Sequence, residues 1–165
     1  MALNITDIHI REIAPGDNQA LASIIKNTLA EFGAARPGTV AFDESTNTLF
    51  EVFRQPRSIY YVAEYEGRLL GGGGIYPTEG LPADTAELVK MYLLKEARGL
   101  GLGKLLIQKS LDFAKDTGYK NVYLETMPEL KDALKTYAKF GFEYLSAPMG
   151  QSGHFGCELW MMKKL

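Results

Sequence analysis

The stretch Arg98-Gly99-Leu100-Gly101-Leu102-Gly103-Lys104 stands between an apolar segment typical of a strand, Glu87–Leu94, and an amphipathic segment typical of a helix, Leu105–Thr117. Its three glycines let the main chain approach an anion closely. The helix that follows presents unpaired N–H groups and the positive end of its dipole to that anion. Two basic residues add positive charge on either side. This run therefore predicts a backbone cradle for a ligand that carries phosphate.

The spacing of the run excludes two other phosphate loops. A P-loop needs Gly-x-x-x-x-Gly-Lys-Ser/Thr, but counting back from Gly103-Lys104 places Arg98 at the first glycine and Leu105 at the hydroxyl. A dinucleotide fingerprint needs Gly-x-Gly-x-x-Gly, and a reading from Gly99 or Gly101 places a lysine or a leucine at the third glycine. Neither P-loop nor nicotinamide chemistry is predicted.

The run does fit Arg/Gln-x-x-Gly-x-Gly/Ala, and here it resembles the acetyl-CoA pyrophosphate loop of the GNAT N-acetyltransferase superfamily. The preceding Ala86–Leu93 and the later Leu124-Glu125-Thr126 and Tyr137-Ala138-Lys139-Phe140-Gly141-Phe142 stand in the order and spacing of that superfamily. The resemblance implies a GNAT-like α/β fold, with a central mixed sheet of about six to seven strands flanked by about four helices.

Length and composition favour one globular domain over residues 1–165. The chain has 165 residues, of which 46% are hydrophobic and 23% charged, enough to bury its own core. The residue pattern predicts strands over Ile8–Ile13, Ser58–Glu64, Leu69–Tyr76, Thr85–Leu94, Asn121–Glu125, Phe142–Leu145 and Cys157–Lys163. It predicts helices from an Asp17 cap to Phe32, over Asp43–Phe53, over Leu105–Thr117 and over Leu130–Phe140.

Charge, cysteine content and hydropathy argue against several classes of partner. A net charge of −2 leaves no basic excess, so nucleic acid is not an expected partner. The single cysteine and two histidines exclude an intrachain disulfide and give too few ligands for a zinc site, so no metal is expected. Met1–Ile13 lacks the apolar core of a signal peptide, and no stretch is long and apolar enough to span a bilayer. We therefore expect a cytoplasmic protein with no membrane partner.

The resemblance implies which residues hold acetyl-CoA. The main chain of the fourth strand pairs with the pantetheine arm and points an N–H group at the thioester oxygen, and the amides of the glycine run hold the pyrophosphate. The implied cofactor-binding residues are Met91, Tyr92, Leu93, Arg98, Gly99, Leu100, Gly101, Leu102, Gly103 and Lys104. Leu130 departs from the pattern, because many members hold a cofactor-binding asparagine at this position.

Three residues are the implied catalytic groups. Tyr137 is the candidate general acid for the leaving thiolate, and its alternative role is that of a core tyrosine. Glu87 and Glu125 are both candidates for the general base, with ordered water as a third possibility. A free carboxylate has a pKa near 4.3 and is a poor base for an amine near 10.4, so burial must raise it or water must relay the proton.

Other unusual residues receive structural interpretations. Gly71–Gly74 indicate a bulge or close backbone packing, or else space for substrate beside the strand. His154 lies in a glycine-flanked loop and is expected to be structural or exposed. Cys157 is expected to be a small buried hydrophobe.

The predicted function is transfer of an acetyl group from acetyl-CoA to a primary amine of a small molecule or peptide, by direct attack of the amine on the thioester. A non-catalytic acyl-CoA-binding module is the alternative, and a protein that holds ATP in the glycine run is another. The sequence leaves a homodimer open: Cys157–Lys163 as an edge strand could pair with a second copy, and pairing within the chain explains the strand equally well.

Overall fold

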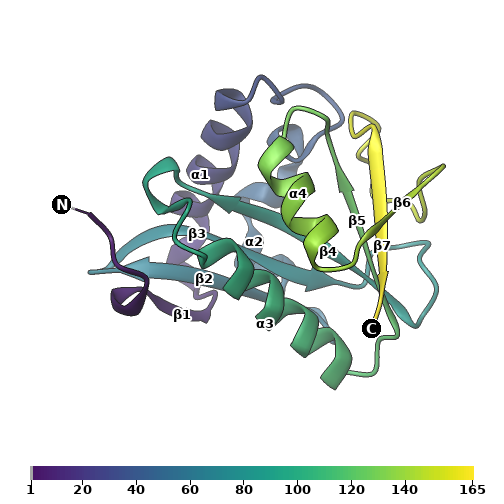
Figure 1. Cartoon of the computed structure of the whole chain (residues 1–165), viewed down its shortest axis with the longest axis horizontal. Helices are drawn as coiled ribbons and strands as arrows, with labels where there is room; N and C mark the ends of the chain where they lie inside the picture. The colour runs from purple at the N-terminus through teal and green to yellow at the C-terminus, as the bar shows by residue number, and fades with distance from the viewer. Residues whose placement is uncertain (1) are drawn as a thin grey trace.

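Seven strands form one mixed sheet in the computed structural model, which describes residues 2–165 (Figure 1). The strand order is β1-β2-β3-β4-β5-β7-β6, and among these residues only β4 and β5 pair in parallel. The strands are β1 (His9–Glu12), β2 (Ile59–Tyr65), β3 (Arg68–Tyr76), β4 (Thr85–Leu93), β5 (Asn121–Thr126), β6 (Glu143–Leu145) and β7 (Leu159–Lys164). The α-helices are α1 (Asn18–Glu31), α2 (Leu49–Val52), α3 (Leu102–Asp116) and α4 (Lys131–Lys139). The predicted mixed α/β sheet of six to seven strands with four helices is confirmed.

Helices cover both faces of the sheet, so the core has two main parts (Figure 1). The apolar stripe of α1, with Leu21, Ile25 and Leu29, packs against β2 and the segment that contains α2. The stripe of α3, with Ile107 and Leu111, packs with α4 against β4 and β5. Within residues 2–165, no helix is long and apolar enough to cross a bilayer.

The helix predicted over Asp43–Phe53 is wrong. The segment forms a 3-10 turn over Glu44–Asn47 and the single-turn α2, separated by Thr48 with φ −133°. The Asp43 carboxylate accepts a hydrogen bond from the Ser45 N–H, and the Thr46 hydroxyl donates to the Val40 carbonyl. Short polar side chains compete with the helix for backbone partners, which explains the break.

Two further expectations need correction. Asp17 makes no side-chain cap on α1, because its carboxylate accepts hydrogen bonds from Arg11 and from the Ala14 N–H. The last strand is not an edge strand, because β7 lies between β5 and β6 and pairs with both. A dimer through that strand is therefore excluded.

A bulge in β4 sets the geometry of the sheet centre. Gly72 faces Tyr92 and Gly74 faces Val89, so two residues of β4 lie opposite Gly73. One of the two, Lys90, has φ +53°, in the left-handed region. The extra residue reverses the alternation of faces: Val89 packs with the α1 side of the core, whereas Met91 packs with the α3 side.

The four glycines of β3 serve close packing and the bulge, which confirms the structural interpretation. A Cβ at Gly71 would lie 2.1 Å from the Tyr92 carbonyl oxygen, and one at Gly74 would lie 2.1 Å from the Ile59 carbonyl oxygen. A Cβ at Gly73 would meet the Met91 side chain. The space beside β3 is filled by neighbouring strands.

Gly74→Ala should lower the free energy of unfolding by about 1–3 kcal/mol, because the added methyl overlaps backbone that cannot move alone. The matched control is Gly16→Ala, since no atom lies within 4 Å of a Cβ at that position. Thermal unfolding of both variants checks this, and equal melting temperatures would contradict the packing argument.

Candidate functional site

The site lies where β4 and β5 part. The parallel pairing covers three positions and ends at Glu87 and Tyr123, although β4 continues to Leu93 and β5 to Thr126. A cavity of about 440 Å³ opens beyond this point, lined by both strands, by the glycine run and by α4. Its volume is in the range of small-molecule sites.

The glycine run supplies one end of the cavity with free hydrogen-bond donors. Within residues 2–165, the N–H groups of positions 99–104 have no acceptor, whereas the neighbouring Arg98 and Leu105 N–H groups are paired. Gly99 and Gly101 have φ values of +78° and +86°, which glycine adopts without strain. A Cβ at Gly103 would come no closer than 3.7 Å to another residue, so no protein atom fills the space beside this glycine. That space is open to a ligand. These residues fit a pyrophosphate group at the N-terminus of α3.

The two basic residues of the run differ in whether their charge is paired within the protein. Lys104 is exposed in the first turn of α3 and has no ion pair among the described residues. The Arg98 guanidinium instead donates to the Glu31 carboxylate at 2.6 Å and to the Leu93 carbonyl at 3.0 Å. Its face also covers the Phe32 ring. The charge of Arg98 is therefore paired within the protein, and the residue shapes the run.

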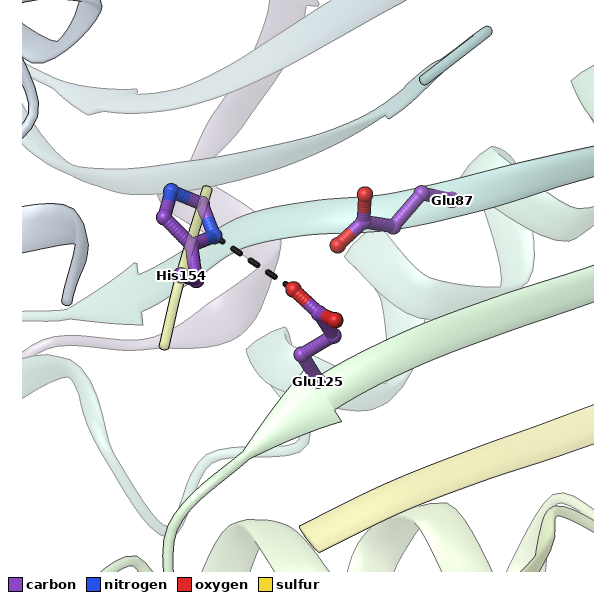
Figure 2. Close-up of side chains that lie close together, drawn as sticks. All are labelled: Glu87, Glu125 and His154. Carbon is purple, nitrogen blue, oxygen red and sulfur yellow. Dashed lines mark ion pairs between the residues drawn. The ribbon is translucent and has the colours of Figure 1, made fainter. Parts of the chain in front are cut away.

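The other end of the cavity holds a charged cluster (Figure 2). Glu87 comes from β4, Glu125 from β5 and His154 from the loop before β7, and one ligand atom from each lies within 4.8 Å of the others. His154 Nδ1 lies 3.6 Å from Glu125 Oε1, and His154 Nε2 lies 3.0 Å from Asp43 Oδ2. Of the two expectations for His154, structural or exposed, only the second is wrong, because its side chain is 12% exposed and links two carboxylates.

Burial and nearby charges shift the pKa values of Glu87 and Glu125 in opposite directions. Burial, reinforced by the negative charge of Glu125, raises the pKa of Glu87 to about 7, although the Thr78 hydroxyl donates to its carboxylate. Burial also opposes ionisation of Glu125, but hydrogen bonds from His154, Ser152 and Tyr123 lower its pKa. These opposite shifts make Glu87 the less acidic of the two carboxyl groups.

His154 carries a positive charge at neutral pH. Burial lowers the pKa of its imidazole, but hydrogen bonds to Asp43 and Glu125 outweigh this effect and raise it to about 9. The ion pairs of His154 with Asp43 and Glu125 account for the position of its ring.

Tyr137 lies on α4 with its ring buried edge-on against Phe142. It lines the cavity, and its hydroxyl has no hydrogen-bond partner within residues 2–165. Burial raises its pKa to about 12, which keeps the phenol protonated. The ring belongs to the core, as the alternative interpretation held, and the residue also borders the cavity. Leu130 adds an apolar side chain to the same wall.

Sequence reasoning missed Asp43, Lys90 and the role of His154. Asp43 and His154 are 111 positions apart and meet only in the folded chain. Lys90 left a signal, because it is the single charge in the otherwise apolar stretch Leu88–Leu94.

Comparisons with known proteins identify the family of the chain and agree with its fold. A model of the acetyltransferase (GNAT) family matches residues 24–142. YjgM, an N-acetyltransferase of Escherichia coli strain K12, is 40% identical over 157 residues and covers 94% of each chain. A GNAT-family acetyltransferase from Staphylococcus aureus Mu50 has the same fold, with TM-score 0.82, 19% identity and coverage of 95% and 98%. The PaiA N-acetyltransferase of Thermoplasma acidophilum, solved with coenzyme A, gives TM-score 0.73, 19% identity and coverage of 96% and 99%.

Glu87→Gln should stabilise the protein increasingly as pH rises from 5 to 8. In the unfolded chain Glu87 ionises at its ordinary pKa, whereas in the fold it keeps its proton until pH about 7. The wild-type free energy of unfolding therefore falls across this interval relative to the variant, by up to about 3 kcal/mol. Melting temperatures at pH 5, 6, 7 and 8 measure the difference. Glu143→Gln, at an exposed site in β6, is the control, and a pH-independent difference for Glu87→Gln would contradict the argument.

Proposed function

Because this chain belongs to the GNAT acetyltransferase family, we propose that it transfers the acetyl group of acetyl-CoA to a primary amine of a small molecule or peptide. The amine attacks the thioester directly. The observation that carries the proposal is the single cavity between β4 and β5, which connects the free N–H groups of residues 99–104 to the buried carboxylate of Glu87. Acetyl-CoA supplies the acetyl group as an activated thioester.

Glu87 accepts the proton of the attacking amine. Its pKa of about 7 lies near the operating pH, where a general base is most effective. Glu125, held in the ionised form by His154 and Ser152, attracts the ammonium form of the amine into the cavity. The two carboxylates thus divide binding and proton transfer between them.

Tyr137 donates a proton to the departing thiolate. A phenol with a pKa of about 12 would be a weak acid toward a thiol in water, whose pKa is about 8.5. Burial in the cavity reduces this mismatch, because it raises the pKa of a thiol, as it does for Cys157, which lines the same cavity.

The backbone of β4 positions the reacting groups. Met91, Tyr92 and Leu93 line the cavity beyond the last residue of β4 that pairs with β5. We assign their main chain to the pantetheine arm and to the thioester oxygen. Backbone donors aimed at a developing oxyanion contribute about 2.7–4 kcal/mol each.

Acetyl-CoA and CoA should each raise the melting temperature, and ATP with Mg²⁺ should not. Ligand at about a hundred times its dissociation constant adds about 2.7 kcal/mol, which is about 5–10 °C for a domain of this size. Gly103→Val should abolish the shift by filling the space beside the free N–H groups, whereas Gly16→Ala should retain it. Stabilisation by ATP alone would refute the proposed function.

Glu87→Gln and Tyr137→Phe should each lower kcat by about 10²–10⁴-fold. Release of the free CoA thiol, measured with a panel of primary amines, checks this. Below pH about 7 the wild-type kcat/KM should fall tenfold per pH unit as Glu87 is protonated, and this limb should vanish in Glu87→Gln. Tyr144→Phe, at an exposed tyrosine on β6, is the control. Full activity in both catalytic variants would overturn the assigned roles.

A further inference from the structure

Lys90 lines the cavity near the charged cluster of Glu87, Glu125 and His154, and the proposed reaction gives it no role. It sits in the β4 bulge at φ +53°, a conformation that a non-glycine residue adopts at some energetic cost. The Tyr60 hydroxyl fixes this bulge by donating to the Lys90 carbonyl at 2.7 Å. The Lys90 side chain is 7% exposed and lines the cavity together with Glu87, Glu125 and His154.

The ammonium of Lys90 has one long ion pair, with Asp43, which leaves part of its hydrogen-bonding capacity unused. Buried lysines are rare unless they are paired. The Asp43 Oδ2 oxygen of this ion pair lies 3.6 Å from Nζ and is bonded to His154 at the shorter distance of 3.0 Å. Over residues 2–165, Nζ makes no hydrogen bond of ordinary length, and Lys90 lines the cavity. The N–H donors that do not face Asp43 are therefore available to a ligand.

Neutralising Asp43 does not explain Lys90. His154 already pairs with the Asp43 carboxylate, which also accepts a hydrogen bond from the Ser45 N–H. Burial lowers the pKa of Lys90 even with Asp43 and Glu87 nearby, so its charge is only partly compensated within the protein. An anion that enters the cavity would satisfy the donors and favour the charged form.

We propose that Lys90 binds the carboxylate of the acceptor, and that the acceptor is therefore a free amino acid. This inference rests on the proposed function, because it places the amino group of the same molecule at Glu87 and Glu125. Three positions of β4 separate Glu87 from Lys90, so their Cα atoms lie at most about 10 Å apart. The ammonium and carboxylate of an amino acid lie closer together than this. In the proposed complex the ammonium lies toward the glutamates and the carboxylate toward the lysine.

The experiment compares each amino acid with the amine that lacks only its carboxylate, for example phenylalanine with phenethylamine and leucine with isopentylamine, and includes ω-amino acids. Thiol release from acetyl-CoA gives kcat and KM. The wild-type protein should prefer the carboxylate-bearing partner at least tenfold in kcat/KM. Lys90→Met should remove this preference, mainly through a higher KM for the amino acid, and Lys90→Arg should restore part of it.

Lys115→Met is the matched control, because Lys115 is exposed in the last turn of α3, and it should keep the wild-type preference. A thermal shift with acetyl-CoA in Lys90→Met shows that the variant is folded and still binds the thioester. Equal loss for both members of each pair, or wild-type use of the decarboxylated amine as good as that of the amino acid, would overturn the inference and leave the acetyltransferase proposal standing. Absence of acetyl-CoA binding in the wild-type protein would instead overturn both.

Discussion

The end of the β4–β5 pairing at Glu87 is the constraint on which the site depends. Two parallel strands that stay paired would leave no room between them, whereas strands that part after three positions leave backbone groups of β4 available to a ligand. The cavity forms at this opening, and the connection between the two strands places the glycine run and the N-terminus of α3 beside it. The binding end and the chemical end of the cavity therefore share one structural origin.

The same opening governs the electrostatics of the site. Glu87 is the last residue of β4 paired with β5 and is buried there, while Glu125 projects from β5 toward it. Two carboxylates so close cannot ionise with equal ease. Burial raises the pKa of Glu87, whereas pairing with His154 lowers that of Glu125, so the proton remains on Glu87 until near neutral pH. A loop far along the chain thus favours the ionised form of Glu125.

Several local features of the site are energetically unfavourable. Lys90 occupies a left-handed conformation, and the glycines of β3 give up side chains so that neighbouring strands can approach the bulge. Burial of Glu87 opposes its ionisation. These features concentrate around one cavity, a pattern expected where function, and not stability, has selected the residues.

The sequence by itself determined the elements whose signal is local. The seven strands, the helices α1, α3 and α4, and the glycine run before α3 follow from periodicity and from the conformational freedom of glycine, which depend on neighbouring residues alone. Only the tertiary structure decided that β7 lies inside the sheet, that Asp43 and His154 meet, and that Glu87 is the less acidic carboxyl. Burial and charge pairing depend on segments far apart in the sequence, 111 positions for Asp43 and His154, and no local pattern records which of them come together.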